Sequence, residues 1–107
     1  MGAWACDALG NDEACGFVQT IVDRISKPIK KKKFDHFDYN EIRAAAKLLS
    51  LISKAGYILD KELVDQAIER IDLIRKDSIF IMEWDNTRDI KAELNKEHQA
   101  LKLLDHM

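Results

Sequence analysis

The chain has 107 residues, of which 47% are hydrophobic and 34% are charged, and its formal net charge is −2. This length predicts one domain over residues 1–107 with a single core, and no apolar run approaches the roughly 20 residues that a membrane span needs. No basic segment followed by an apolar one marks a secretory signal, so we expect a cytoplasmic protein without a membrane partner.

The first predicted helix covers about residues 12–26. Asn11, Asp12 and Glu13 place a capping side chain and two acids at its start, where free N–H groups and the helix dipole favour them. Pro28 follows and is expected to end the helix. An apolar stripe with spacings of three and four is expected to face the core, and it consists of Ala14, Phe17, Val18, Ile21, Val22 and Ile25.

The lysines at residues 30–33 predict an exposed connection to the next helix. With Lys27 before it and three aromatic residues after it, the run has the composition of a nucleic-acid contact built from charge and stacking. A basic footprint normally dominates such domains, whereas this chain is acidic overall, so we expect no direct nucleic-acid partner. The aromatic residues are interpreted as anchors of the connection on the bundle, and they are Phe34, Phe37 and Tyr39.

A second helix is predicted from about residue 38 to Gly56. Asp38 stands at its N-cap with Glu41 three residues later, which is close to a capping box. The small residues 44–46 allow another helix to approach closely. The predicted inward face consists of Ile42, Ala45, Ala46, Leu49 and Ile52.

A third helix is predicted after Asp60, its expected cap, with Val64, Ala67, Ile68, Ile71 and Ile74 inside. It pauses at Asp77 and Ser78, after which residues 79–82 fit either a helical turn or a short buried strand. A helical turn is favoured because no partner strand is evident. A last helix begins at Asp85 and Asn86, with Ile90, Leu94, Leu101 and Leu104 inside. The sequence therefore predicts an all-α fold, a single-domain bundle of about four helices.

The acidic residues of the second half follow a pattern. Up to Lys54 the chain has nine Lys and Arg against seven Asp and Glu, and from Ala55 onward it has eight against twelve. The third helix carries a band opposite its apolar face, formed by Glu62, Asp65, Glu69 and Asp72. On the fourth helix the acids recur every four residues at Asp89, Glu93 and Glu97.

Like charges at these spacings destabilise a helix by roughly 0.2 to 0.5 kcal/mol per pair. Lys61, Lys76 and Lys96 are placed to relieve Asp65, Asp72 and Glu93, whereas Glu69 and Glu97 lack such a neighbour. One interpretation is a solvated helix face. The other is a carboxylate surface that is retained because a basic partner docks there.

No catalytic or metal-binding motif stands out. There is no G-x-S-x-G and no glycine-rich phosphate loop. His36, His98 and His106 lie too far apart to suggest a metal site, and Cys6 and Cys15 are interpreted as small hydrophobic residues. His36 and Asp38 are near enough to share a proton, but such pairs are common in polar loops. We therefore expect no enzymatic activity, no catalytic residue, no metal and no cofactor.

The opening segment, MGAWACDALGNDEACGF, resembles a bacterial domain-of-unknown-function family of small helical proteins that begin M-G-x-W-G and carry N-D before the first helix. EIRAAAKLLSLI is similar to that family's alanine-rich second helix, and AIERIDLIRKDSIFIMEWD is similar to its third. The chain departs from the family pattern at Ala5, Leu9, Gly16 and Phe17. The resemblance implies that Trp4 packs across the bundle as part of the core.

Members of that family are similar to immunity proteins encoded beside polymorphic or contact-dependent toxins. The resemblance implies a cytoplasmic monomer that forms a 1:1 complex with a cognate basic toxin domain and blocks its active site. A nuclease is expected, with an RNase favoured, because carboxylates can occupy a cationic groove in place of phosphates. The alternative is a cytoplasmic helical adaptor of unrelated role. The predicted toxin-binding residues are Glu62, Asp65, Glu69, Asp72, Asp89, Glu93 and Glu97.

Overall fold

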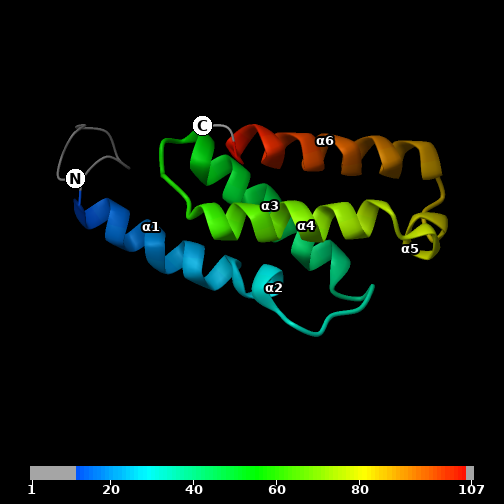
Figure 1. The fold of residues 1–107 in the computed structure, drawn as a ribbon, viewed down its shortest axis with the longest axis horizontal. Coiled ribbons are helices and arrows are strands. Elements are labelled where there is room, and N and C mark those ends of the chain that lie inside the picture. The colour runs from blue at the N-terminus through cyan, green and yellow to red at the C-terminus, as the bar shows by residue number, and fades with distance from the viewer. Residues whose placement is uncertain (1–11, 106–107) are drawn as a thin grey trace.

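The computed structural model describes residues 12–105, and it contains helices and no strand in that range. The all-α prediction is confirmed, with four longer helices as predicted and two short ones between them (Figure 1). Trp4, Cys6, Asn11 and His106, with the roles predicted for the first three, lie outside the described residues. The helices are α1 (Asp12–Ile25), α2 (Lys27–Lys30), α3 (Tyr39–Lys54), α4 (Lys61–Arg75), α5 (Ser78–Met82) and α6 (Thr87–Asp105).

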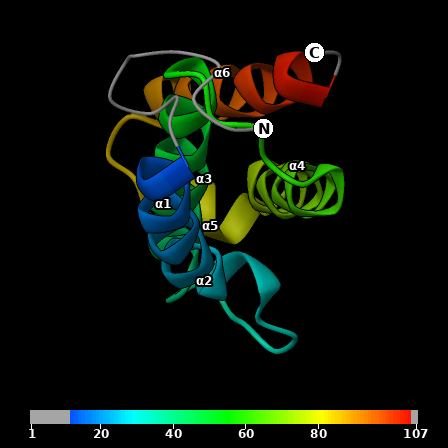
Figure 2. The ribbon, with the colours of Figure 1, turned by 90° about the vertical axis from the view of Figure 1, so that its left-hand side faces the viewer.

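The helices pack around α3, α4 and α6. α4 and α6 run antiparallel and form the most extensive helix pair, and α3 contacts both of them (Figure 1). Among the described helices, α1 contacts only α2 and α3. Seen from the end of the molecule, α1 and α3 lie on one side and α4 on the other (Figure 2).

One hydrophobic cluster joins residues from all six helices. The inward faces predicted for the second, third and fourth helices are confirmed, with Ile52, Ile68 and Leu104 partly buried at the edge of the cluster. The side chains that are excluded from solvent almost completely include Ile29, Ile42, Leu49, Ile71, Ile74, Leu94 and Leu101.

The stripe predicted for α1 is confirmed only in part. Val18 and Val22 are buried and Ile25 is partly buried, but Phe17 is 69% exposed and Ile21 is 38% exposed. The prediction that the whole stripe faces the core was wrong because, within residues 12–105, α1 packs only on α2 and α3. Those two helices cover a narrow side of α1.

Pro28 follows the end of α1, as predicted, and is the second residue of the short helix α2. α1 ends at Ile25, and Pro28 lies in the first turn of α2, where the missing N–H of proline is tolerated. The backbone N–H of Ser26 donates to the carbonyl of Val22 across the junction. Lysines 31–33 are exposed, as predicted, while Lys30 is the last residue of α2.

Two acids predicted as caps do not cap through their side chains. Asp38 precedes α3, but its carboxylate accepts hydrogen bonds from the Asp35 backbone N–H and from Lys31 Nζ, each at 3.1 Å. Asp60 precedes α4 and makes no side-chain cap hydrogen bond. Both residues occupy the predicted N-cap positions, but the predicted side-chain caps were wrong at both. At Asp38, a lysine and a loop N–H bind the carboxylate instead.

Asp77 caps α5 and also joins it to α3. Its Oδ1 accepts from the N–H groups of Ile79 and Phe80 at 3.1 and 3.2 Å, so residues 79–82 are helical, as favoured. Its Oδ2 accepts from the Tyr39 hydroxyl at 2.8 Å. Burial and this carboxylate raise the pKa of Tyr39 to about 12. The same hydrogen bond lowers the pKa of Asp77.

The aromatic residues after the lysine run differ in burial. Tyr39 is buried, and Phe34 is partly buried with its ring centroid 4.5 Å from Cζ of Arg70 on α4. These two anchor the connection, as predicted. Phe37 is 82% exposed, so the anchoring role predicted for it was wrong.

Candidate functional site

Three of the predicted binding residues form one exposed row on α4, and we call Glu62, Asp65 and Glu69 the α4 acidic strip. Their spacing places them on the side of the helix opposite the buried Ile71. Lys61 Nζ lies 3.9 Å from Asp65 Oδ2, with both side chains at least half exposed, and such pairs contribute little stability. Glu62 and Glu69 form no hydrogen bond or ion pair with any residue that the structure describes.

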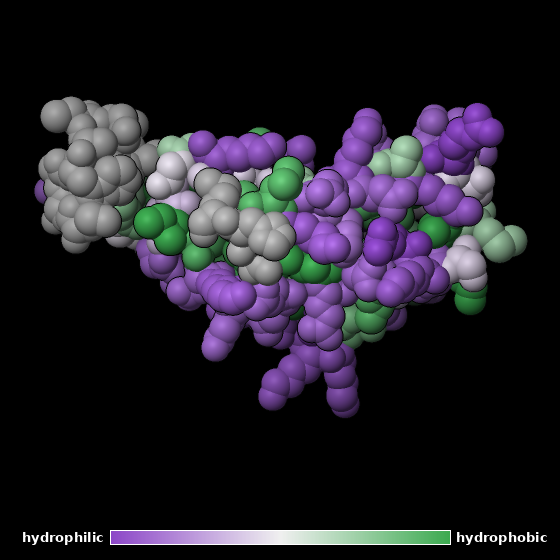
Figure 3. Space-filling view, turned by 45° about the horizontal axis from the view of Figure 1, so that its top comes forward, coloured by the Kyte–Doolittle hydropathy of each residue, from purple (hydrophilic) through white to green (hydrophobic). Residues whose placement is uncertain are grey.

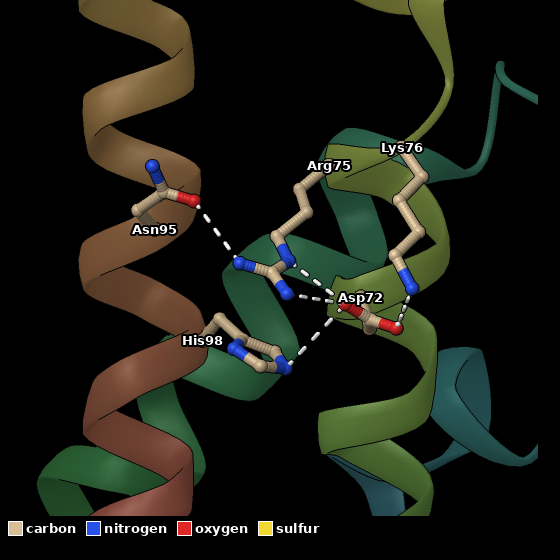
Figure 4. A network of polar contacts seen from close by, with 5 residues as sticks. All are labelled: Asp72, Arg75, Lys76, Asn95 and His98. Atoms are coloured by element: carbon tan, nitrogen blue, oxygen red, sulfur yellow. Dashed lines mark hydrogen bonds and ion pairs between the residues drawn. The ribbon is translucent and has the colours of Figure 1, made fainter.

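Asp72 continues the spacing of the strip but has a different environment (Figure 4). Its Oδ2 lies 2.8 Å from Lys76 Nζ, and its Oδ1 lies 2.8 Å from Arg75 Nε. These hydrogen bonds lower the pKa of Asp72 to about 2. Arg75 extends to Asn95 of α6 at 3.2 Å. Asp72 therefore belongs to a polar network between α4 and α6, and two basic side chains neutralise it.

His98 of α6 adjoins this network and is only 7% exposed. Its Nε2 lies 3.7 Å from Asp72 Oδ1 (Figure 4). Burial lowers the pKa of the imidazole, and the charge of Arg75 lowers it further, whereas Asp72 acts in the opposite direction. The folded protein therefore favours the neutral form of His98.

The free energy of unfolding is expected to fall as the pH drops below about 6.5, the usual pKa of histidine in an unfolded chain. In that range the His98 side chain takes up a proton more readily in the unfolded chain than in the folded protein. The free energy of unfolding therefore falls by at most about 1.4 kcal/mol per pH unit. Urea unfolding at pH 7.5 and pH 5.5 measures the slope, and His98→Gln should flatten it. Equal slopes for the parent and His98→Gln would contradict this assignment.

The three predicted residues of α6 do not share one environment. Asp89 is exposed in the first turn, and Glu93 is exposed with its Oε1 3.5 Å from Lys96 Nζ. The side chain of Glu97 is only 14% exposed, and it accepts two hydrogen bonds from the guanidinium of Arg43 at 2.9 and 2.8 Å. Glu97 has no cationic neighbour at helical spacing on α6, as the sequence indicated, but Arg43 of α3 binds it across the helix interface.

The seven predicted residues therefore do not form a single surface. Glu93 and Glu97 border a shallow hollow with Lys47 of α3, on the flank of α6 that faces α3. The α4 acidic strip lies on a different helix, and Asp72 is turned toward His98. Figure 3 shows the face over α6 covered mainly by hydrophilic side chains, with smaller hydrophobic areas between them.

Two arginines whose side chains join different helices were not predicted from the sequence. Arg43 binds Glu97, and its Nη1 also lies 3.2 Å from Asn40 Oδ1. Arg70 donates to backbone carbonyls at the end of α2 and just beyond it. In the sequence, Arg43 follows the buried Ile42, and Arg70 precedes the buried Ile71. This position at the border of a buried face is the one sequence signal for the two arginines, and it is weak.

Among the described residues, no group of three or more His, Cys, Asp and Glu side chains is arranged to hold a metal ion. None of the helices within residues 12–105 has the length and apolar character needed to cross a membrane. Comparisons with protein-family models, with curated proteins and with solved structures gave no match to this chain.

Proposed function

We propose that this protein binds and neutralises a cognate bacterial toxin domain through the α4 acidic strip. The observation that carries the proposal is that Glu62, Asp65 and Glu69 are exposed together, while the neighbouring Asp72 is neutralised within the fold. Like charges three and four residues apart destabilise a helix by roughly 0.2 to 0.5 kcal/mol per pair. A cationic partner surface turns this unfavourable arrangement into a favourable contact.

The partner is a basic toxin domain, with a nuclease and specifically an RNase favoured. Neighbours three and four residues apart on a helix are separated by roughly 5 to 6 Å, so the strip presents a row of negative charges to a groove that binds phosphates. The protein acts in the cytoplasm as a monomer, forms a 1:1 complex and blocks the active site of the toxin. The opening segment resembles a family of small helical proteins whose members are similar to immunity proteins, and this resemblance supports this class of partner.

The remaining predicted residues take different parts in this proposal. Asp89 and Glu93 are exposed and are assigned to the periphery of the contact. Asp72 and Glu97 are assigned an indirect role, because each is bound by basic side chains of the same protein. The strip itself therefore makes the direct contact.

Neutralising the strip with Glu62→Gln, Asp65→Asn and Glu69→Gln is expected to weaken toxin binding roughly tenfold at low salt, since an exposed charge contributes only about 0.2 to 1 kcal/mol. The salt dependence of binding should become shallower, because fewer charges take part. Helicity and melting temperature should stay the same or rise slightly. The proposal requires that the gene immediately upstream encode a large secreted protein with a variable C-terminal domain. The measurement is a calorimetric titration of that domain at low and moderate salt.

A matched control removes the same amount of charge elsewhere. Glu13→Gln, Glu41→Gln and Asp85→Asn change three exposed acids outside α4, and toxin affinity should stay near that of the parent. Equal weakening by both variants would place the contact off the strip and leave only a general charge effect. A parent protein that binds no neighbouring toxin domain would overturn the proposed function itself.

A further inference from the structure

A groove with a volume of about 520 Å³ lies between α1 and α2 on one side and α3 on the other. Its apolar lining comes from both sides, from Ile25 and Pro28 and from Ala45 and Leu48. Figure 2 shows α1 and α3 grouped together and α4 on the other side of the molecule. The groove is therefore separate from the α4 acidic strip.

Exposed apolar side chains continue the groove along both walls. Ile21 lies one helical turn before Ile25 and is 38% exposed. Leu51 lies almost one turn after Leu48, and these two are 48% and 46% exposed. Spacings of three and four keep each pair on the same face of its helix, and α1 packs on α3. Together these side chains form an apolar surface that the described part of the fold leaves open, which is typical of an interaction site.

Basic side chains gather at one end of the groove. Arg24, Lys27 and Lys31 line it there. Lys31 is paired with Asp38 at 3.1 Å, whereas Arg24 and Lys27 form no hydrogen bond or ion pair with any residue in the described range. The remaining lysines of residues 30–33 adjoin this end and are exposed. Glu41 also lines the groove, but the basic residues outnumber the acidic ones at this end.

The backbone at the basic end is held in place from α4. Arg70 Nε donates to the Ile29 carbonyl and Arg70 Nη2 to the Lys31 carbonyl, both at 3.2 Å. The same guanidinium lies over the Phe34 ring. A wall fixed in this way loses little conformational freedom on binding, which favours affinity.

We propose that this groove binds an amphipathic helical segment of a partner protein, with the apolar face of the segment on the groove floor and its acidic residues against Arg24 and Lys27. Apolar rows on two packed helices suit the anchors of a bound helix at spacings of three and four. The unpaired cations select an acidic segment over a basic one. This partner has the opposite charge to the toxin domain proposed for the α4 acidic strip and binds on the other side of the molecule.

The test uses a labelled synthetic peptide of about four helical turns, with leucines on one face and glutamates on the other, and the full-length protein. In fluorescence polarisation, this peptide should bind about tenfold more tightly than a peptide with lysine in place of each glutamate. A peptide with serine in place of each leucine should not bind. Arg24→Gln with Lys27→Gln should weaken binding about fivefold, and Leu48→Glu should abolish it.

Arg88→Gln with Lys91→Gln is the matched control, because it removes two exposed cations of α6 and should leave peptide affinity unchanged. Circular dichroism confirms that each variant is folded. Equal affinity for the glutamate and lysine peptides, no saturable binding, or full binding by Leu48→Glu would overturn the proposal. So would a dimer of the protein that Leu48→Glu dissociates, because a second copy would then occupy the groove. These variants keep the α4 acidic strip, so their toxin binding is a separate result.

Discussion

Leu94→Ala is expected to lower the free energy of unfolding by about 3 to 4 kcal/mol. Leu94 is completely buried on α6, and α6 forms its most extensive contact with α4. The substitution removes apolar surface and leaves a cavity that close-packed neighbours fill only in part. For a domain of about this size, such a loss lowers the melting temperature by more than about 10 °C.

Leu103→Ala is the matched control, because it makes the same chemical change in the same helix at a side chain that is 59% exposed. It should change stability by no more than about 0.5 kcal/mol. Urea unfolding followed by circular dichroism measures both variants at one pH and one protein concentration. Equal losses from the two substitutions would show that α6 is rotated about its axis relative to the packing described above.

The inward faces of α3, α4 and α6 were predictable because each of these helices contacts several others. On α4, Ala67, Ile71 and Ile74 follow the helical repeat and are all fully buried. The interruption at Asp77 was also predictable, since an aspartate before an apolar run is a typical cap. Hydrophobic periodicity predicts the buried faces of such helices well, because the apolar side of each helix is also the side that other helices cover.

Periodicity was less informative for α1. It identified the apolar side of the helix correctly, but it carries no information about how many neighbours cover that side. The exposed Phe17 and Ile21 therefore follow the same pattern as the buried Val18 and Val22. The groove beside them could not be predicted, because it depends on where α1 and α3 pack.

The candidate site was predictable only where local geometry decides it. The exposure of Glu62, Asp65 and Glu69 follows from their position opposite the apolar face of α4. Asp72 is bound by Arg75 and Lys76 of its own helix, and the spacing of Lys76 predicted that pair. Glu97 obeys the same spacing rules, but its partner Arg43 comes from another helix. Sequence spacing along one helix cannot distinguish a free carboxylate from one that is bound across a helix interface.

Arg43→Met is expected to lower the free energy of unfolding by roughly 2 to 3 kcal/mol, somewhat less than the loss on breaking a fully buried ion pair. The side chains of Arg43 and Glu97 are 17% and 14% exposed, and their hydrogen bonds join α3 to α6. The guanidinium also lies 5.7 Å from the ring centroid of Trp84. Methionine keeps much of the packing but leaves the carboxylate of Glu97 without its partner, and an unpaired carboxylate is costly away from solvent.

Lys47→Met is the control, since it removes an exposed cation one helical turn later in α3, and its effect should lie within about 0.5 kcal/mol. Combining Arg43→Met with Glu97→Met completes a double-mutant cycle, and the double variant should regain part of the stability lost by either single one. A coupling energy above about 1 kcal/mol at moderate salt is the expected result. A coupling energy near zero would show that the ion pair does not hold α3 and α6 together. Glu97 would then be grouped with Asp89 and Glu93 as a carboxylate that is available to a basic partner.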